Sequence, residues 1–250
     1  MTKSEQQHAT TGDGRSITLE LRNVSLTLGT GANRTDALVD VNLEVARGEL
    51  VAVTGRSGSG KSSLLNVAGG LVAPSSGSVL VRGTDLATVS AKELSAARRR
   101  SVGYVFQDLN LMATLTAVEN VALPLELDGV RVRTAREQAV AALSAVEIGD
   151  LADRFPDEMS GGQRQRVAIA RGLVGERSLL LADEPTGALD EVTAEGVMTI
   201  LRQQCDDGAA TLMVTHDPSL AAWADRVIRL RDGRIDSVSA PSTRSLVDFG

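Results

Sequence analysis

The sequence predicts an α/β domain with a mostly parallel core sheet. Short apolar runs rich in Val, Ile and Leu alternate with helical segments, as in sheets that are buried on both faces. The four clearest runs are Leu50–Thr54, Val102–Phe106, Leu179–Ala182 and Thr211–Thr215. Near the N-terminus, apolar and polar residues alternate instead over 17–21 and 41–45, which indicates strands with one exposed face.

The composition is that of a globular protein with one large domain. Of 250 residues, 42% are hydrophobic and 23% are charged. The net charge of −6 differs from the basic balance of most nucleic-acid binders, so we expect no nucleic-acid partner. Cys205 is the only cysteine, which excludes an internal disulfide. No apolar run is long enough to cross a bilayer, and the polar start lacks a signal-peptide core, so we expect a soluble, cytosolic chain.

The pattern divides the chain into a domain and two tails. We expect a disordered N-terminal tail over residues 1–15, a domain over 16–236 and a polar C-terminal tail over 237–250. Within the domain, residues of about 88–160 are mainly helical around one strand and form the predicted helical subdomain.

Three helix starts carry capping signals. Ser90 with Glu93, and Thr134 with Glu137, fit the capping box in which two side chains bind the backbone reciprocally. Asp217, followed by proline, fits a helix N-cap. A face of small and apolar residues follows Thr134 at helical spacing, which favours an amphipathic helix there.

One segment fits a phosphate-binding loop. Gly55–Ser62 matches the pattern GxxxxGK[ST] between a predicted strand and a predicted helix, a context that makes a chance glycine-rich loop a poor alternative. The glycines turn backbone N–H groups toward an anion, and the helix start adds its positive end. In this hypothesis Lys61 binds the β- and γ-phosphates of ATP, and Ser62 is an oxygen ligand of Mg²⁺. The residues assigned to the nucleotide are Gly55, Arg56, Ser57, Gly58, Ser59, Gly60, Lys61, Ser62 and Ser63.

Polar side chains follow three other predicted strands. Asp183 and Glu184 end one strand, Gln107 follows a second and His216 follows a third. Ligands of open α/β sheets bind outside the carboxyl ends of the strands, so we expect these residues beside the phosphate loop. Asp183 is then a candidate Mg²⁺ ligand and Glu184 a candidate for polarising the attacking water. An acidic turn and a structural histidine are the alternatives for these residues taken singly.

The segment Ser160–Arg171, with the letters SGGQRQRVAIAR, resembles the signature motif of ABC ATPases. The resemblance spans roughly residues 17–236 and includes the phosphate loop, Gln107, Asp183–Glu184, the turn Ala188–Leu189–Asp190 and His216, in the family's order. It implies a P-loop NTPase fold of ABC type, with an N-terminal antiparallel β subdomain and an inserted helical subdomain.

The resemblance also implies a composite site. Two copies would dimerise head to tail and bury two ATP molecules, each between the phosphate loop of one copy and the signature of the other. Gln107 would be a Mg²⁺ ligand that senses the γ-phosphate, His216 would hold that phosphate, and Asp190 would cross the interface and couple the two sites. The signature residues assigned to the nucleotide are Ser160, Gly161, Gly162 and Gln163.

Within the family, the segments around Phe106–Gln107, Glu119–Asn120 and Ala182–Asp190 resemble the macrolide-export, lipoprotein-release and cell-division branch. That resemblance implies an ATPase at the cytoplasmic face of the membrane, bound peripherally to an integral permease of the FtsX-like or macrolide-exporter-like type. An amino-acid importer ATPase is an alternative, although importers typically have serine where Gly187 stands. A soluble, non-transport ABC ATPase is the other alternative. It would be expected to show a coiled coil, a tandem domain or a basic face, none of which the sequence displays.

Two features depart from the pattern or stay open. Leu28 occupies the position where ABC ATPases usually place the aromatic residue that stacks on adenine, so we expect weaker nucleotide affinity or base selectivity. The run Arg98–Arg100 is either a solvated helix face or a surface near Gln107 that faces the membrane partner.

Overall fold

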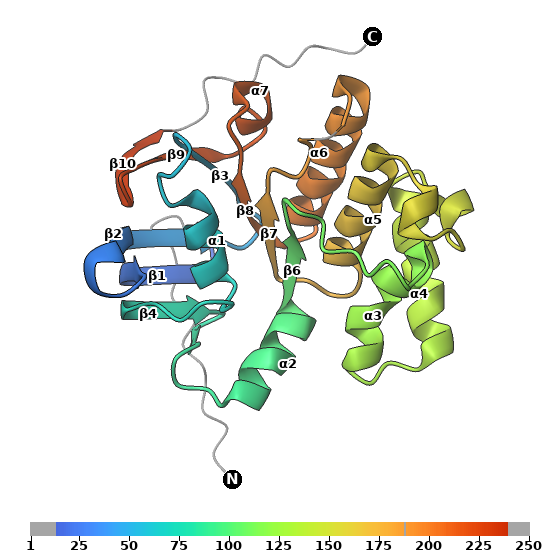
Figure 1. Ribbon diagram of the computed structural model, residues 1–250, viewed down its shortest axis with the longest axis horizontal. Helices are drawn as coiled ribbons and strands as arrows, with labels where there is room; N and C mark the ends of the chain where they lie inside the picture. Colours follow the sequence, from blue (N-terminus) through green and yellow to red (C-terminus); the bar gives the residue numbers. More distant parts are fainter. Residues whose placement is uncertain (1–13, 188, 240–250) are drawn as a thin grey trace.

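The structure is a computed structural model that describes residues 14–187 and 189–239 (Figure 1). Predicted features at residues 1–13, 188 and 240–250 lie outside the described part. The strands are β1 (Ile17–Leu28), β2 (Thr35–Ala46), β3 (Leu50–Thr54), β4 (Ser76–Val81), β5 (Thr84–Asp85), β6 (Val102–Val105), β7 (Leu179–Asp183), β8 (Ala210–Val214), β9 (Arg226–Arg231) and β10 (Arg234–Ser239). The α-helices are α1 (Lys61–Ala68), α2 (Ala91–Ser101), α3 (Ala117–Leu127), α4 (Val132–Ala145), α5 (Gly161–Leu173), α6 (Glu191–Asp206) and α7 (Pro218–Ala221). Three short 3-10 helices complete the described elements: Gly31–Asn33, Gly149–Leu151 and Pro156–Glu158.

The core sheet has the predicted parallel character. Its six strands run in the order β10-β9-β3-β8-β7-β6, and every neighbouring pair is parallel except β10 with β9. Every residue of the central strands β7 and β8 is buried, which explains why these strands are almost continuously apolar. The four apolar runs identified in the sequence are β3, β6, β7 and β8, so the parallel sheet predicted from them is confirmed.

A second, antiparallel sheet forms the N-terminal β subdomain that the resemblance implies. It has four strands in the order β2-β1-β4-β5, and all of its pairs are antiparallel. Helix α1 contacts strands of both sheets, and its Leu64 and Leu65 are fully buried. One apolar cluster joins the antiparallel sheet, α1 and the facing side of the core sheet, so α1 is packed between the two sheets.

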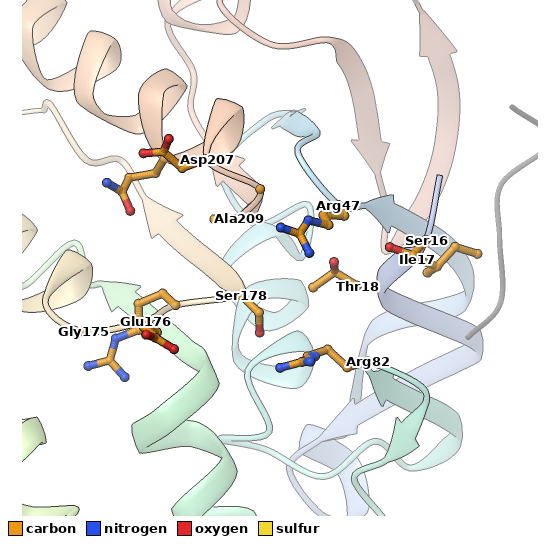
Figure 2. A pocket seen from close by; sticks show the side chains of 13 residues that line it. Ser16, Ile17, Thr18, Arg47, Arg82, Gly175, Glu176, Ser178, Asp207 and Ala209 are labelled. Atoms are coloured by element: carbon orange, nitrogen blue, oxygen red, sulfur yellow. The ribbon is translucent and has the colours of Figure 1, made fainter. Parts of the chain in front are cut away.

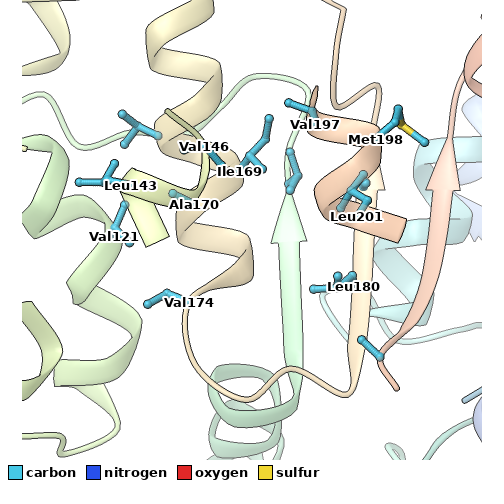
Figure 3. Packing of buried hydrophobic residues seen from close by; sticks show 14 of the residues in the cluster. Val121, Leu143, Val146, Ile169, Ala170, Val174, Leu180, Val197, Met198 and Leu201 are labelled. Atoms are coloured by element: carbon cyan, nitrogen blue, oxygen red, sulfur yellow. The ribbon is translucent and has the colours of Figure 1, made fainter. Parts of the chain in front are cut away.

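The other face of the core sheet is covered by helices. A second apolar cluster joins β7 to α5 and α6 and continues to α3 and α4 (Figure 3). Val197, Met198 and Leu201 of α6 share this cluster with Ile169 of α5 and Leu180 of β7. The predicted helical subdomain over about 88–160 is continuous with this layer, although the range also contains β6, which belongs to the core sheet.

Two of the three predicted helix caps are confirmed and one is wrong. Ser90 caps α2 with Glu93 in a capping box, and Asp217 caps α7. Thr134, by contrast, lies inside α4, which begins at Val132 with Arg131 as its N-cap. The Ala135 N–H bonds the Arg131 carbonyl at 2.9 Å, so the first helical turn already includes Thr134. Glu137 accepts a bond from Arg133 at 3.0 Å and does not bind the backbone as a capping box requires.

The predicted C-terminal boundary is also corrected. Strand β10 continues to Ser239, three residues beyond the predicted domain end at 236 and into the predicted tail 237–250. Backbone pairing with β9 orders this segment although most of its side chains are exposed, so its polar composition resembles that of a tail.

The arginine run Arg98–Arg100 forms part of the last turn of α2 and is bonded to other elements, so it is not simply a solvated helix face. Arg98 donates to the Gly70 carbonyl at 3.0 Å, and Arg100 pairs with Asp128 at 2.7 Å. These contacts connect α2 to the end of α1 and to the end of α3.

The contact between β6 and α5 gives a stability prediction. A Cβ atom at Gly103 would overlap the Gly172 carbonyl oxygen and press on Leu180, so Gly103→Ala is expected to lower the free energy of unfolding by about 3 kcal/mol. Gly196 in α6 meets no described atom within 4 Å, so Gly196→Ala is expected to raise that free energy by about 0.5–1 kcal/mol. Urea denaturation of both variants measures whether each change lowers or raises the free energy of unfolding. Equal effects would contradict the close β6–α5 contact.

Candidate active site

A cavity of about 500 Å³ opens at the carboxyl ends of β3, β6, β7 and β8. It brings together the phosphate loop and all the strand-end residues that the sequence singled out. Its lining residues are Leu28, Thr35, Asp36, Ala37, Gly55, Ser57, Gly58, Gly60, Lys61, Ser62, Ser63, Gln107, Asp183, Glu184, Val214 and His216. Of the predicted loop residues, Arg56 and Ser59 do not line the cavity, and Ser59 is buried beneath the loop.

Glycine conformations shape the loop between β3 and α1. Gly58 and Gly60 have φ values of +79° and +101°, in the left-handed region that favours glycine. A side chain at Gly60 would also overlap the Ala37 carbonyl of β2. Lys61 begins α1, and its ammonium donates to the carbonyls of Gly55 at 2.9 Å and Arg56 at 3.0 Å. The lysine therefore spans the loop, with its charge beside the space that a phosphate would fill.

The carboxylate of Asp183 fits a divalent cation. Asp183 ends β7 and is 7% exposed. Burial raises its pKa, the hydrogen bond from Ser62 opposes that rise, the charge of Glu184 adds to it and the charge of Lys61 opposes it. The net rise means that the protein does not fully compensate the buried negative charge, and a bound Mg²⁺ would do so. Hydroxyl, carboxylate and amide oxygens of Ser62, Asp183 and Gln107 are ligand types that Mg²⁺ accepts.

Glu184 is held in an unusual backbone conformation beside His216. Its φ is +49°, which costs a residue with a side chain about 1–2 kcal/mol. His216 Nδ1 lies 2.8 Å from Glu184 Oε1, with the imidazole side chain 76% exposed and the glutamate side chain 16% exposed. The hydrogen bond with Glu184 and its negative charge raise the pKa of His216. The histidine is therefore ready to contact either Glu184 or a ligand in the cavity.

The signature residues lie elsewhere. Ser160 caps α5, and with Gln163 it forms a capping box. Ser160, Gly162 and Gln163 line a separate cavity of about 280 Å³ together with Asp190, whose carboxylate caps α6 through the backbone N–H of Thr193. Within one chain the structure does not bring the signature or Asp190 into the cavity of the phosphate loop.

Four cavity residues were missed by the sequence reasoning, and one of them, Val214, ends β8. Thr35, Asp36 and Ala37 come from the start of β2, which the contact between Gly60 and Ala37 places against the phosphate loop. No local pattern marks them, because only the packing of the antiparallel sheet against α1 brings them there.

A second large cavity, of about 510 Å³, lies at the opposite, amino-terminal ends of β7 and β8 (Figure 2). Its lining carries charges of both signs: Arg47, Arg82 and Arg177 are cationic, and Glu176 and Asp207 are anionic. It contains none of the residues predicted for the site, so cavity size alone does not locate the site.

Comparison with known proteins decides the family. Residues 38–187 match the family described as ABC transporter. The chain belongs to the ABC transporter family. This ABC cassette is 43% identical over 217 residues to the macrolide export ATP-binding/permease protein MacB of Brucella melitensis, and equally to that of Salmonella typhi. Each match covers 87% of the chain but 34% of the relative, so the cassette spans about a third of the length of these relatives.

Solved structures agree on the fold of this ABC ATPase cassette. A dimeric bacterial ABC transporter cassette, MJ0796, superposes with a TM-score of 0.85 and 39% identity, covering 90% of this chain and 99% of that one. The same cassette in a dimeric post-hydrolysis state bound to ADP and phosphate also superposes with a TM-score of 0.85, at 38% identity. Among the described residues of the cassette, no helix is both long and apolar enough to span a membrane.

The contact between His216 and Glu184 predicts a shifted titration. His216 is expected to titrate above the usual histidine pKa of about 6.5, and Glu184→Gln is expected to return it toward that value because the neighbouring charge is lost. The stabilising effect of the pair is then complete below about pH 6.5 and disappears as the pH rises through the folded-state pKa. NMR titration of the imidazole signals measures the His216 pKa in the wild-type protein and in Glu184→Gln. His8, the other histidine of the sequence, gives a second signal for comparison. An unchanged His216 pKa in Glu184→Gln would contradict the contact.

Proposed function

We propose that the chain binds and hydrolyses Mg²⁺–ATP, dimerises head to tail with a second copy, and powers a separate membrane-spanning permease. One observation carries the proposal. A single cavity unites the phosphate loop with Asp183, Glu184 and His216, while the signature of the same chain lies in a different cavity. A complete site then requires the signature of another chain.

Six of the cavity residues have a defined role in this proposal. Ser62, Asp183 and Gln107 would hold Mg²⁺, which supplies positive charge to the phosphate oxygens. Lys61 would leave the carbonyls of its own loop to contact the β- and γ-phosphates. Glu184 would accept a proton from the attacking water, and His216 would bind the γ-phosphate or support Glu184 through their hydrogen bond.

No described Phe, Tyr or Trp lines the cavity, and Leu28 is its proposed contact with adenine. Leu28 ends β1, lines the cavity and is 45% exposed, so it is accessible to a base. An aliphatic side chain provides contact area without stacking, which supports weaker affinity or looser base selectivity than a ring would give.

The signature is arranged to act on a second copy. A side-chain Cβ atom at Gly161 would have no described heavy atom within 4 Å outside its chain neighbours and its own helix backbone. The start of α5 therefore faces open space. Backbone N–H groups at such a helix start suit an anion. The γ-phosphate of an ATP bound by the partner copy would fill this position, and Asp190 would lie at the same interface.

The relatives support the membrane partner. The matched relatives are named ATP-binding/permease proteins, and the cassette corresponds to about a third of their length. We infer that an integral permease of the macrolide-exporter-like or FtsX-like type supplies the membrane part, with the cassette bound peripherally at the cytoplasmic face.

Replacing the proposed base tests the reaction. Glu184→Gln keeps the side-chain shape and loses the basicity, so turnover is expected to fall by a factor of about 100 or more while ATP binding persists. An ATP-dependent dimer is expected to accumulate, which size-exclusion chromatography with ATP detects. Glu176→Gln, an exposed change in the cavity at the far end of the sheet, is the control and should retain turnover. Near-wild-type hydrolysis by Glu184→Gln would remove Glu184 from its role.

Mixing two inactive variants tests the composite site. Lys61→Ala breaks the phosphate loop, and Gly161→Asp breaks the signature without a clash inside its own chain. A mixed dimer has one site with both defects and one intact site, so part of the ATPase activity is expected to return on mixing. A monomer that hydrolyses ATP at the full rate, with Gly161→Asp unaffected, would contradict the head-to-tail arrangement.

A further inference from the structure

The helix that begins at the signature also contacts the backbone of the candidate catalytic glutamate. Gln165, in the second turn of α5, is only 3% exposed. Its side-chain amide donates to the Pro185 carbonyl and lies 3.4 Å from the Glu184 carbonyl. A buried amide of this kind is costly unless it is bonded, so it holds these two carbonyls in place.

Glu184 needs such support. Its positive φ is an unfavourable conformation that persists only where neighbouring contacts enforce it. On the sheet side, the Glu184 N–H donates to the Val214 carbonyl of β8 at 3.0 Å. Gln165 supplies the support from the helical side.

The next residue of α5 contacts the other end of the same segment. Arg166 donates to the Thr193 hydroxyl at 2.8 Å, and that hydroxyl donates to the Asp190 carboxylate at 2.8 Å. Helix α5 therefore contacts Glu184 through Gln165, and reaches Asp190 through Arg166 and the Thr193 hydroxyl.

We infer that Gln165 is a positioning residue that fixes the Glu184 carboxylate and connects it to the signature helix of the same chain. The inference rests on the proposed role of Glu184. Because the signature would contact the nucleotide of the partner copy, a shift of α5 on that contact would reach the chain's own Glu184 through Gln165. The state of one site would thereby set the geometry of the base in the other.

The test replaces Gln165 with methionine, which has similar length and lacks the amide donors. In Gln165→Met, kcat is expected to fall about tenfold or more, whereas nucleotide affinity stays within about twofold because the phosphate loop is untouched. Steady-state ATPase assays and titration with a fluorescent ATP analogue measure the two quantities.

Asn120 offers a matched control. Its fully buried amide donates to the carbonyls of Met112, Leu115 and Thr116, none of which is bonded to Glu184. Asn120→Leu is expected to lower the thermal midpoint about as much as Gln165→Met while changing kcat by less than about twofold. Equal losses of kcat in both variants would overturn the inference, because general destabilisation would then account for them.

A double variant separates positioning from general damage. Gln165→Met is expected to add no further loss of hydrolysis in the Glu184→Gln background, because both changes disable the same group. A multiplicative loss would overturn the inference. If Gln165→Met does not fold, Gln165→Asn decides the matter, since it keeps the amide polarity but is one methylene shorter. It too is expected to lose kcat while retaining nucleotide affinity.

Glu184→Gln and Gln165→Met together distinguish failure of the proposed base from failure of its positioning. Full turnover in Glu184→Gln would refute the proposed base. An inactive Glu184→Gln together with a fully active, folded Gln165→Met would refute only the positioning role.

Discussion

The packing of helix α1 between the two sheets is the constraint on which the site depends. Leu64 and Leu65 are fully buried among strands of both sheets, so packing fixes the position of the start of the helix. That start carries Lys61 and Ser62, and the glycine before it contacts β2 too closely to accept a side chain. The antiparallel sheet therefore shapes the cavity of the phosphate loop in two ways. It supports the loop from beneath and supplies Thr35, Asp36 and Ala37 to the cavity wall.

The second constraint is the common direction of the core strands. Because β3, β6, β7 and β8 run parallel, the residues that follow them meet at one edge although they are far apart in sequence. This is why the cavity could be predicted from the sequence. The position of a residue just after a buried apolar run is visible without knowledge of the fold, and Gln107, Glu184 and His216 were identified in this way.

The features that could not be predicted from the sequence depend on contacts that no local pattern shows. Thr134 has the composition of a cap, but the Ala135 N–H already bonds the Arg131 carbonyl at 2.9 Å, so the helix begins at Val132 and Thr134 lies inside it. Strand β10 is polar, and only its pairing with β9 identifies it as a strand. Gln165 lies within the signature segment, and no sequence pattern distinguishes it from its neighbours as the residue that bonds the carbonyls of Glu184 and Pro185.

The polar edge strand has a consequence for assembly. The outer strand of a sheet offers unpaired backbone groups to any extended segment, and proteins commonly protect such edges with charges. In β10 most side chains are exposed, and Arg234 and Asp236 lie among them. An edge of this kind disfavours the joining of two core sheets into a continuous one, which would be a permanent and ligand-independent union. The proposed association between copies would then use the face that carries the phosphate loop, where it would be made and broken once per catalytic cycle.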